Sequence, residues 1–127
     1  MRKSNNIFWI ALSAIVTAAI SVGLLFYKKN RPINRDIIRL NDITEWIKRN
    51  KKDAAKCYAT KVSELPNELL QKVIKTFGNI ENPQTSLWLT LTDSNENILQ
   101  STVIQSPLFA EDVIALLGDN GFTEITI

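Results

Sequence analysis

The chain has 127 residues, a formal net charge of +2 and a hydrophobic content of 45%. It contains one cysteine and no histidine. These counts exclude an intrachain disulfide, Ser-His and Cys-His catalytic pairs, and the commonest metal ligand in proteins.

An uncharged apolar run covers residues 7–27, after a short N-terminal tail of residues 1–6. A helix of that length extends about 30 Å, the thickness of a bilayer core. Trp9 and Tyr27 lie near its two ends, and aromatic rings of this kind favour membrane interfaces. The run therefore predicts a single transmembrane helix. A cleaved signal peptide is the alternative, but its apolar core is shorter and is followed by small residues.

One face of this predicted helix carries small and weakly polar side chains. They are Ser13, Ala14, Thr17, Ala18 and Ser21. Small residues let two helices approach closely, and hydroxyl groups can hydrogen-bond across the contact. We therefore expect a helix-docking surface for another membrane protein or for a second copy of the chain. In the alternative, the hydroxyls bond to carbonyls of their own helix.

Charge is distributed unevenly after the apolar run. Residues 28–61 carry a net charge of +7, and residues 62–127 carry −7. The basic linker, residues 28–35, adjoins the predicted span, and anionic lipid headgroups attract such segments. Its basic residues, expected at the membrane interface, are Lys28, Lys29, Arg31 and Arg35. The excess of basic residues on this side favours a cytoplasmic C-terminal domain, with the opposite orientation as the alternative.

Residues 36–53 are predicted to form a basic amphipathic helix. Its apolar positions, spaced for one helix face, are Ile37, Ile38, Leu40, Ile43, Trp46 and Ile47. In one interpretation the helix lies on lipid headgroups, with Trp46 at the membrane interface. In the other, the apolar face covers the following domain or a partner helix.

Residues 57–127 are predicted to form one small α+β domain. The expected strands cover residues 57–65, 87–92, 98–105 and 123–127, with helices over 66–77 and 107–117. This β-α-β-β-α-β order is the split βαβ pattern of ferredoxin-like domains. If residues 57–65 are not a strand, the domain becomes a three-stranded α+β layer.

Cys57 is the residue that could supply nucleophilic chemistry, with Lys56 and Lys61 available to lower its pKa. Its position in a predicted strand favours a buried apolar role instead. Residues 93–97 imitate the start of a calcium-binding loop, but Ile98 stands where such a loop needs glycine. We therefore interpret this segment as a hairpin turn.

The adjacent carboxylates Glu111 and Asp112 lie near the start of the predicted helix 107–117, where negative charge is favourable without any catalytic role. The sequence thus predicts no catalytic residue, no cofactor and no metal site. Nucleic-acid binding is not expected either, because the predicted sheet lies in the part of the chain with net charge −7.

These observations favour a non-catalytic subunit or adaptor of a membrane protein complex, anchored by a single pass and acting through protein–protein contacts. Its expected partners are the lipid bilayer and other membrane proteins, or a second copy of the chain. The alternative is a membrane-tethered sensory domain that binds a small ligand.

Overall fold

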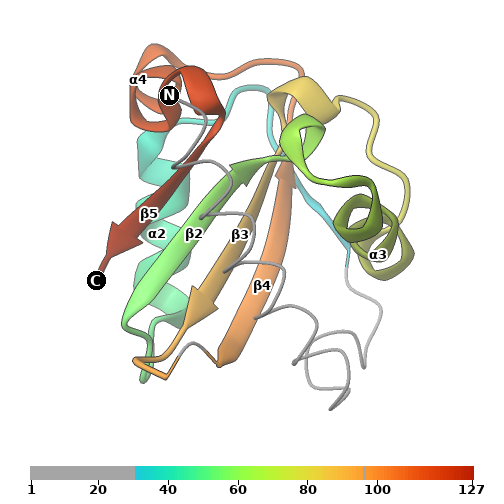
Figure 1. Cartoon of the computed structure of the whole chain (residues 1–127). Coiled ribbons are helices and arrows are strands. Elements are labelled where there is room, and N and C mark those ends of the chain that lie inside the picture. Colours follow the sequence, from blue (N-terminus) through green and yellow to red (C-terminus); the bar gives the residue numbers. More distant parts are fainter. Residues whose placement is uncertain (1–30, 96) are drawn as a thin grey trace.

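Five strands form one mixed sheet in the computed structural model, which describes residues 31–95 and 97–127 (Figure 1). The strands are β1 (Ile33–Asn34), β2 (Lys56–Lys61), β3 (Leu87–Thr92), β4 (Ile98–Gln105) and β5 (Phe122–Thr126). Their order across the sheet is β1-β4-β3-β2-β5. The β1–β4 pair is parallel, and the other three pairs are antiparallel.

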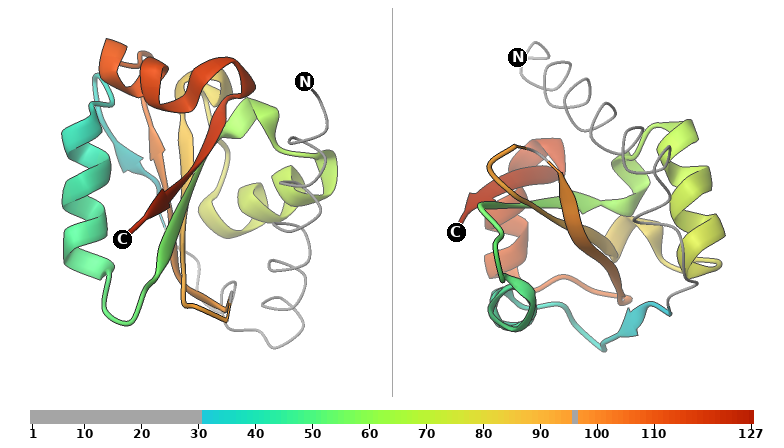
Figure 2. Two further views of the ribbon diagram at one scale, coloured as in Figure 1. Left: turned by 60° about the vertical axis from the view of Figure 1, so that its left-hand side comes forward. Right: turned by 90° about the horizontal axis from the view of Figure 1, so that it is seen from below.

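Helices cover both faces of this sheet (Figure 2). They are α2 (Leu40–Asn50), α3 (Asn67–Phe77) and α4 (Glu111–Leu117). The apolar side chains of α2 and α4 pack together with those on one face of β2 and β3, and α3 packs on the opposite face. The domain therefore has three layers, with the sheet in the middle.

Strand β3 shows why the sequence produces two cores. All six of its residues are buried, and its side chains alternate between the faces. Leu89 and Leu91 lie in the core beneath α2 and α4, whereas Trp88 lies in the core beneath α3. The indole Nε1–H of Trp88 donates a hydrogen bond of 2.7 Å to Ser101 Oγ on β4. The polar N–H group of this buried ring therefore has its hydrogen-bond acceptor within the sheet.

Helix α2 begins against α4. The backbone N–H of Leu40 donates to Asp112 Oδ1 at 3.2 Å, and that of Arg39 donates to Asp42 Oδ2 at 2.8 Å. These carboxylates satisfy N–H groups that a helix start leaves unpaired. At the other end of α2, basic side chains occupy the last turn. Both arrangements suit the helix dipole, which is positive at its start and negative at its end.

Strand β1 is short, and Pro32 limits it at its start. Proline has no backbone N–H to donate to a ladder, so it belongs at the start of a strand or outside it. Only Ile33 and Asn34 pair with β4, opposite Ile104 and Gln105. The outer edge of β4 before residue 104 is consequently left without a strand partner in the described part of the chain.

The fold class expected from the sequence was wrong. The described residues form a small α+β domain with a five-stranded mixed sheet and three α-helices, and it is not ferredoxin-like. In a split βαβ unit the strands joined by a helix run parallel, but β2 and β3, which α3 joins, pair directly and antiparallel. Helix α2, which was expected outside the domain, belongs to its layers. So do Ile33 and Asn34 of β1, which were expected in the linker of residues 28–35.

A hydrogen bond explains this topology. The N–H of Val62, directly after β2, donates to the carbonyl of Ser86, directly before β3, at 2.9 Å. The connection that contains α3 therefore leaves and re-enters the sheet at the same end. A chain that returns at the same end must continue in the opposite direction, so the two strands are antiparallel.

The described residues do not contain the transmembrane helix of the expected fold class. Over residues 31–95 and 97–127, no helix has both the length and the apolar character needed to cross a bilayer. The longest helices there have 11 residues, about half of what a span requires. The predicted segment 7–27 lies outside the described residues.

Candidate functional site

The most exposed aliphatic side chains of the described residues lie beside and on α4. Leu108 precedes the helix and is 54% exposed, and Ile114 on the helix is 56% exposed. Most other large apolar side chains of the domain are buried in the two cores. Exposed apolar groups on a small domain are typical of protein contact sites when several occur close together. We define the α4 surface by Leu108, Glu111 and Ile114.

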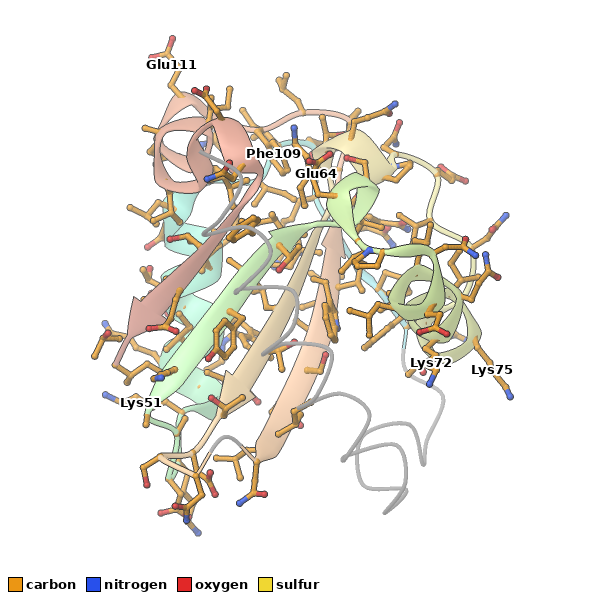
Figure 3. All side chains as sticks on the ribbon, in the orientation of Figure 1. Lys51, Glu64, Lys72, Lys75, Phe109 and Glu111 are labelled. Carbon is orange, nitrogen blue, oxygen red and sulfur yellow. The ribbon has the colours of Figure 1, made fainter. Side chains whose placement is uncertain are left out.

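The loop before α4 holds this surface in place. Phe109 is buried against α2, and an isolated parallel bridge joins it to Ile38. The N–H of Ile38 donates to Leu108 O at 3.0 Å, and Ala110 N–H donates to Ile38 O at 2.9 Å. Because Phe109 points into the core, its neighbour Leu108 is directed outward. Figure 3 shows Phe109 and Glu111 at this end of the domain.

Carboxylates accompany the exposed aliphatic residues. Glu111 and Asp112 occupy the first turn of α4, and both are exposed. Asp112 is held by the N–H of Leu40, whereas Glu111 projects away from the ribbon in Figure 3. The α4 surface thus combines apolar area with negative charge. That combination suits a partner that offers apolar and basic groups.

The structure places three of the residues expected at a membrane interface. Trp46 lies in the core between α2 and the sheet and is 7% exposed. Arg35 is exposed, and its Nε lies 3.3 Å from Asp42 Oδ1, so its guanidinium forms an ion pair within the domain. Arg31 is exposed ahead of β1. These three residues are not gathered into one site.

The other predicted site residues lie outside the described part of the chain. They are Trp9, Ser13, Ala14, Thr17, Ala18, Ser21, Tyr27, Lys28 and Lys29. The helix-docking surface and most of the membrane interface therefore stay predictions.

Cys57 lies in the core beneath α2 and α4 and is fully buried. Burial raises the pKa of its thiol from 9.0 to about 12, against a smaller opposing effect of a hydrogen bond with the backbone of Thr90. The thiolate is the nucleophilic form of cysteine. Nucleophilic chemistry at neutral pH is therefore disfavoured at this position.

The segment between β3 and β4 is a turn closed by its own side chain. Asp93 Oδ1 accepts hydrogen bonds from the backbone N–H groups of Asn95 and Asn97 at 2.8 and 2.9 Å. The hydrogen bonds with Asn97 lower the pKa of this carboxyl group most. No cluster of three or more potential ligands for a metal ion occurs within residues 31–95 and 97–127.

Three threonine hydroxyls on the α3 face of the sheet are buried and have no hydrogen-bond partner among the described residues. They belong to Thr60, Thr90 and Thr92. The strand register places them on the same face as Tyr58 and Trp88. Unsatisfied buried polar atoms are uncommon in folded proteins. They are the polar groups of the sheet that a small ligand could use.

Sequence reasoning missed Leu108 and Ile114 because it sought the buried side of the helix. The stripe expected to be buried contained Phe109, Val113, Leu116 and Leu117, of which Leu116 is only half-buried and the other three are buried. Ile114 follows Val113 by one residue and so lies about 100° around the helix from it. The sequence did contain a signal for this surface, because Ile114 is an apolar residue outside the buried stripe and follows Glu111 and Asp112 closely in the chain.

No protein-family model, curated protein or solved structure gives a significant match to this chain.

Proposed function

We propose that the protein is a non-catalytic subunit or adaptor that acts through protein–protein contacts, and that the α4 surface is one of its contact sites. The observation that carries the proposal is the exposure of Leu108 and Ile114, which lie three residues before and after Glu111 in the chain. Contact sites commonly combine exposed apolar groups with a charged rim. The buried, protonated thiol of Cys57 supports a role that needs no nucleophile.

Membrane attachment forms part of this proposal through the apolar run of residues 7–27 in the sequence. A cytoplasmic domain and contact with lipid depend on residues 1–30 as well. These points rest on the sequence and stay predictions.

The test compares two variants of the full chain that remove exposed apolar side chains from different surfaces. One carries Leu108→Ser and Ile114→Ser on the α4 surface, and the control carries Leu99→Ser on β4, where the side chain is 40% exposed. A photo-reactive side chain at position 114 forms an adduct with the protein that contacts the α4 surface and so identifies it. The same side chain at position 44, on the outer side of α2, is a second control.

We expect one adduct of defined stoichiometry from position 114. The protein identified in this way, once purified, should bind the wild-type chain and the Leu99→Ser control equally. The double serine variant should bind it at least about tenfold more weakly, as expected for two buried aliphatic contacts. Equal binding by all three proteins, or no adduct from position 114, would refute the proposal.

A sensory domain for a small ligand is the second candidate, supported by the unpartnered hydroxyls of Thr60, Thr90 and Thr92. A metabolite that occupies this face should raise the melting temperature of the wild-type chain. Replacing Thr90 with Val should abolish that rise, because it removes the hydroxyl and keeps the shape. A rise that persists in Thr90→Val would place the ligand elsewhere.

A further inference from the structure

We infer that the α4 surface binds the basic end of α2 in a second copy of the chain, which gives head-to-tail self-association. This inference rests on the proposed function, because it names the partner of the same surface. It follows from the placement of opposite charges at the two ends of one helix.

The basic end of α2 is defined by Lys48, Arg49, Lys51 and Lys52. All four side chains are exposed. Asp53 is the carboxylate next to them, so residues 48–53 carry a net charge of +3. The two basic residues in the last turn of α2 suit its dipole, and the other two extend the positive charge into the following turn. None of the four forms an ion pair with another described residue.

The α4 surface lies at the opposite end of α2. The bond between Leu40 N–H and Asp112 places the start of α2 against α4. Helix α2 has 11 residues and is therefore about 16 Å long. Figure 3 shows the result, with Glu111 at one end of the domain and Lys51 at the other. The two charged regions are thus too far apart to neutralise each other within one copy at physiological salt.

Complementary regions at opposite ends of one molecule produce a heterologous contact. Each copy offers its acidic end to the basic end of the next, so the contact generates a ring or an open chain. Charge complementarity provides orientation and rate of encounter, and the burial of Leu108 and Ile114 provides affinity. A symmetric dimer would instead place like charges opposite each other at this surface.

The experiment measures the mass distribution of the full chain in a non-ionic detergent by sedimentation velocity. We expect concentration-dependent oligomers at about 0.1 M salt that dissociate at about 1 M, where the screening length falls to about 3 Å. The variants Glu111→Lys and Lys51→Glu/Lys52→Glu should each weaken association roughly five- to tenfold. The variant that combines all three changes should recover it, because both charges are then reversed.

The matched control is Lys72→Glu/Lys75→Glu on α3, which changes the net charge as much as the α2 variant does. These two lysines lie on neither end of α2 (Figure 3). We expect the control to associate like the wild type.

Three outcomes would overturn the inference. The first is a monomer at all concentrations, and the second is an oligomer that ignores salt and charge reversal, as contact through residues 13–21 would. The third is a monomer that binds phosphatidylserine-rich vesicles and loses this binding in Lys51→Glu/Lys52→Glu, which would assign the basic end to lipid. Loss of a different partner in the Leu108/Ile114 variant, without any self-association, would leave the proposed function standing and remove this inference alone.

Discussion

Asp112 and Leu40 are 72 residues apart in the chain, and a hydrogen bond between them joins α4 to α2. The carboxylate at the start of α4 accepts the N–H at the start of α2, at 3.2 Å. One side chain thus satisfies the end of another helix and fixes where the two helices meet. The negative charge also interacts favourably with the positive end of the α2 dipole.

Replacing Asp112 with Ala should therefore lower the free energy of unfolding by about 1 kcal/mol, the usual effect of losing a helix cap. Asp112→Asn should lose less, because its amide oxygen still accepts the hydrogen bond. Urea unfolding followed by circular dichroism measures both, with the neighbouring Glu111→Ala as the control. An Ala variant as stable as that control would argue against the cap.

Breaking the Trp88–Ser101 hydrogen bond from the serine side should lower the free energy of unfolding by more than the usual net value of one hydrogen bond. Ser101→Ala leaves the buried indole N–H without an acceptor, which costs about 1–3 kcal/mol. Trp88→Phe removes the donor as well as part of the ring, so a cycle of the two single variants and the double variant isolates the pair. We expect the serine change to cost little once Trp88 is Phe. Additive effects would show that the bond contributes nothing.

Stability should depend on pH through Cys57. The thiol has a pKa near 9.0 when exposed and about 12 in the fold. Between these values the folded state holds a proton that the unfolded state has lost. The contribution of this group to stability is therefore complete below pH 9 and declines as the pH rises towards 12. The free energy of unfolding, measured from pH 9 to pH 12, should therefore fall more steeply for the wild type than for Cys57→Ala. Parallel curves would contradict the raised pKa.

Gly121 should resist replacement. Its φ angle is +75°, and an added Cβ would lie 2.8 Å from Cγ of Glu64. Its carbonyl also accepts the N–H of Lys61 at 2.7 Å, next to the last residue of β2 to pair with β5. Gly121→Ala should lower the free energy of unfolding by about 1–2 kcal/mol, mostly through backbone strain. Asp119→Ala, at an exposed neighbouring position, should stay close to the wild type in thermal denaturation.

Local patterns in the sequence located most elements of the domain. The alternation of Leu87, Trp88 and Leu89 marks a strand that the structure places at residues 87–92. Pro66 and Gly78 bracket a helix that covers residues 67–77. Such patterns depend only on residues that are close in the chain, so they can be recognised without knowledge of the fold.

The sheet order could not be obtained in the same way. Periodicity shows which side of a strand is buried, but it does not show which strand lies next to it. The pairing of Lys56 with Thr126 and the Ile38–Phe109 bridge join residues about 70 apart. Strand β1 was missed because two residues after a proline carry no periodic pattern. The α4 surface was missed because the periodic pattern was used to find the buried side of α4, and Ile114 lies off that side.

The position of β2 has a consequence for biosynthesis. This strand lies inside the sheet, yet one of its two neighbours is β5, which follows it by about 60 residues. While the ribosome makes the intervening segments, one edge of β2 has no partner and can pair with another chain. Closure of the sheet must wait for residues 122–126, so folding is expected to be slow for a domain of this size and sensitive to chaperones.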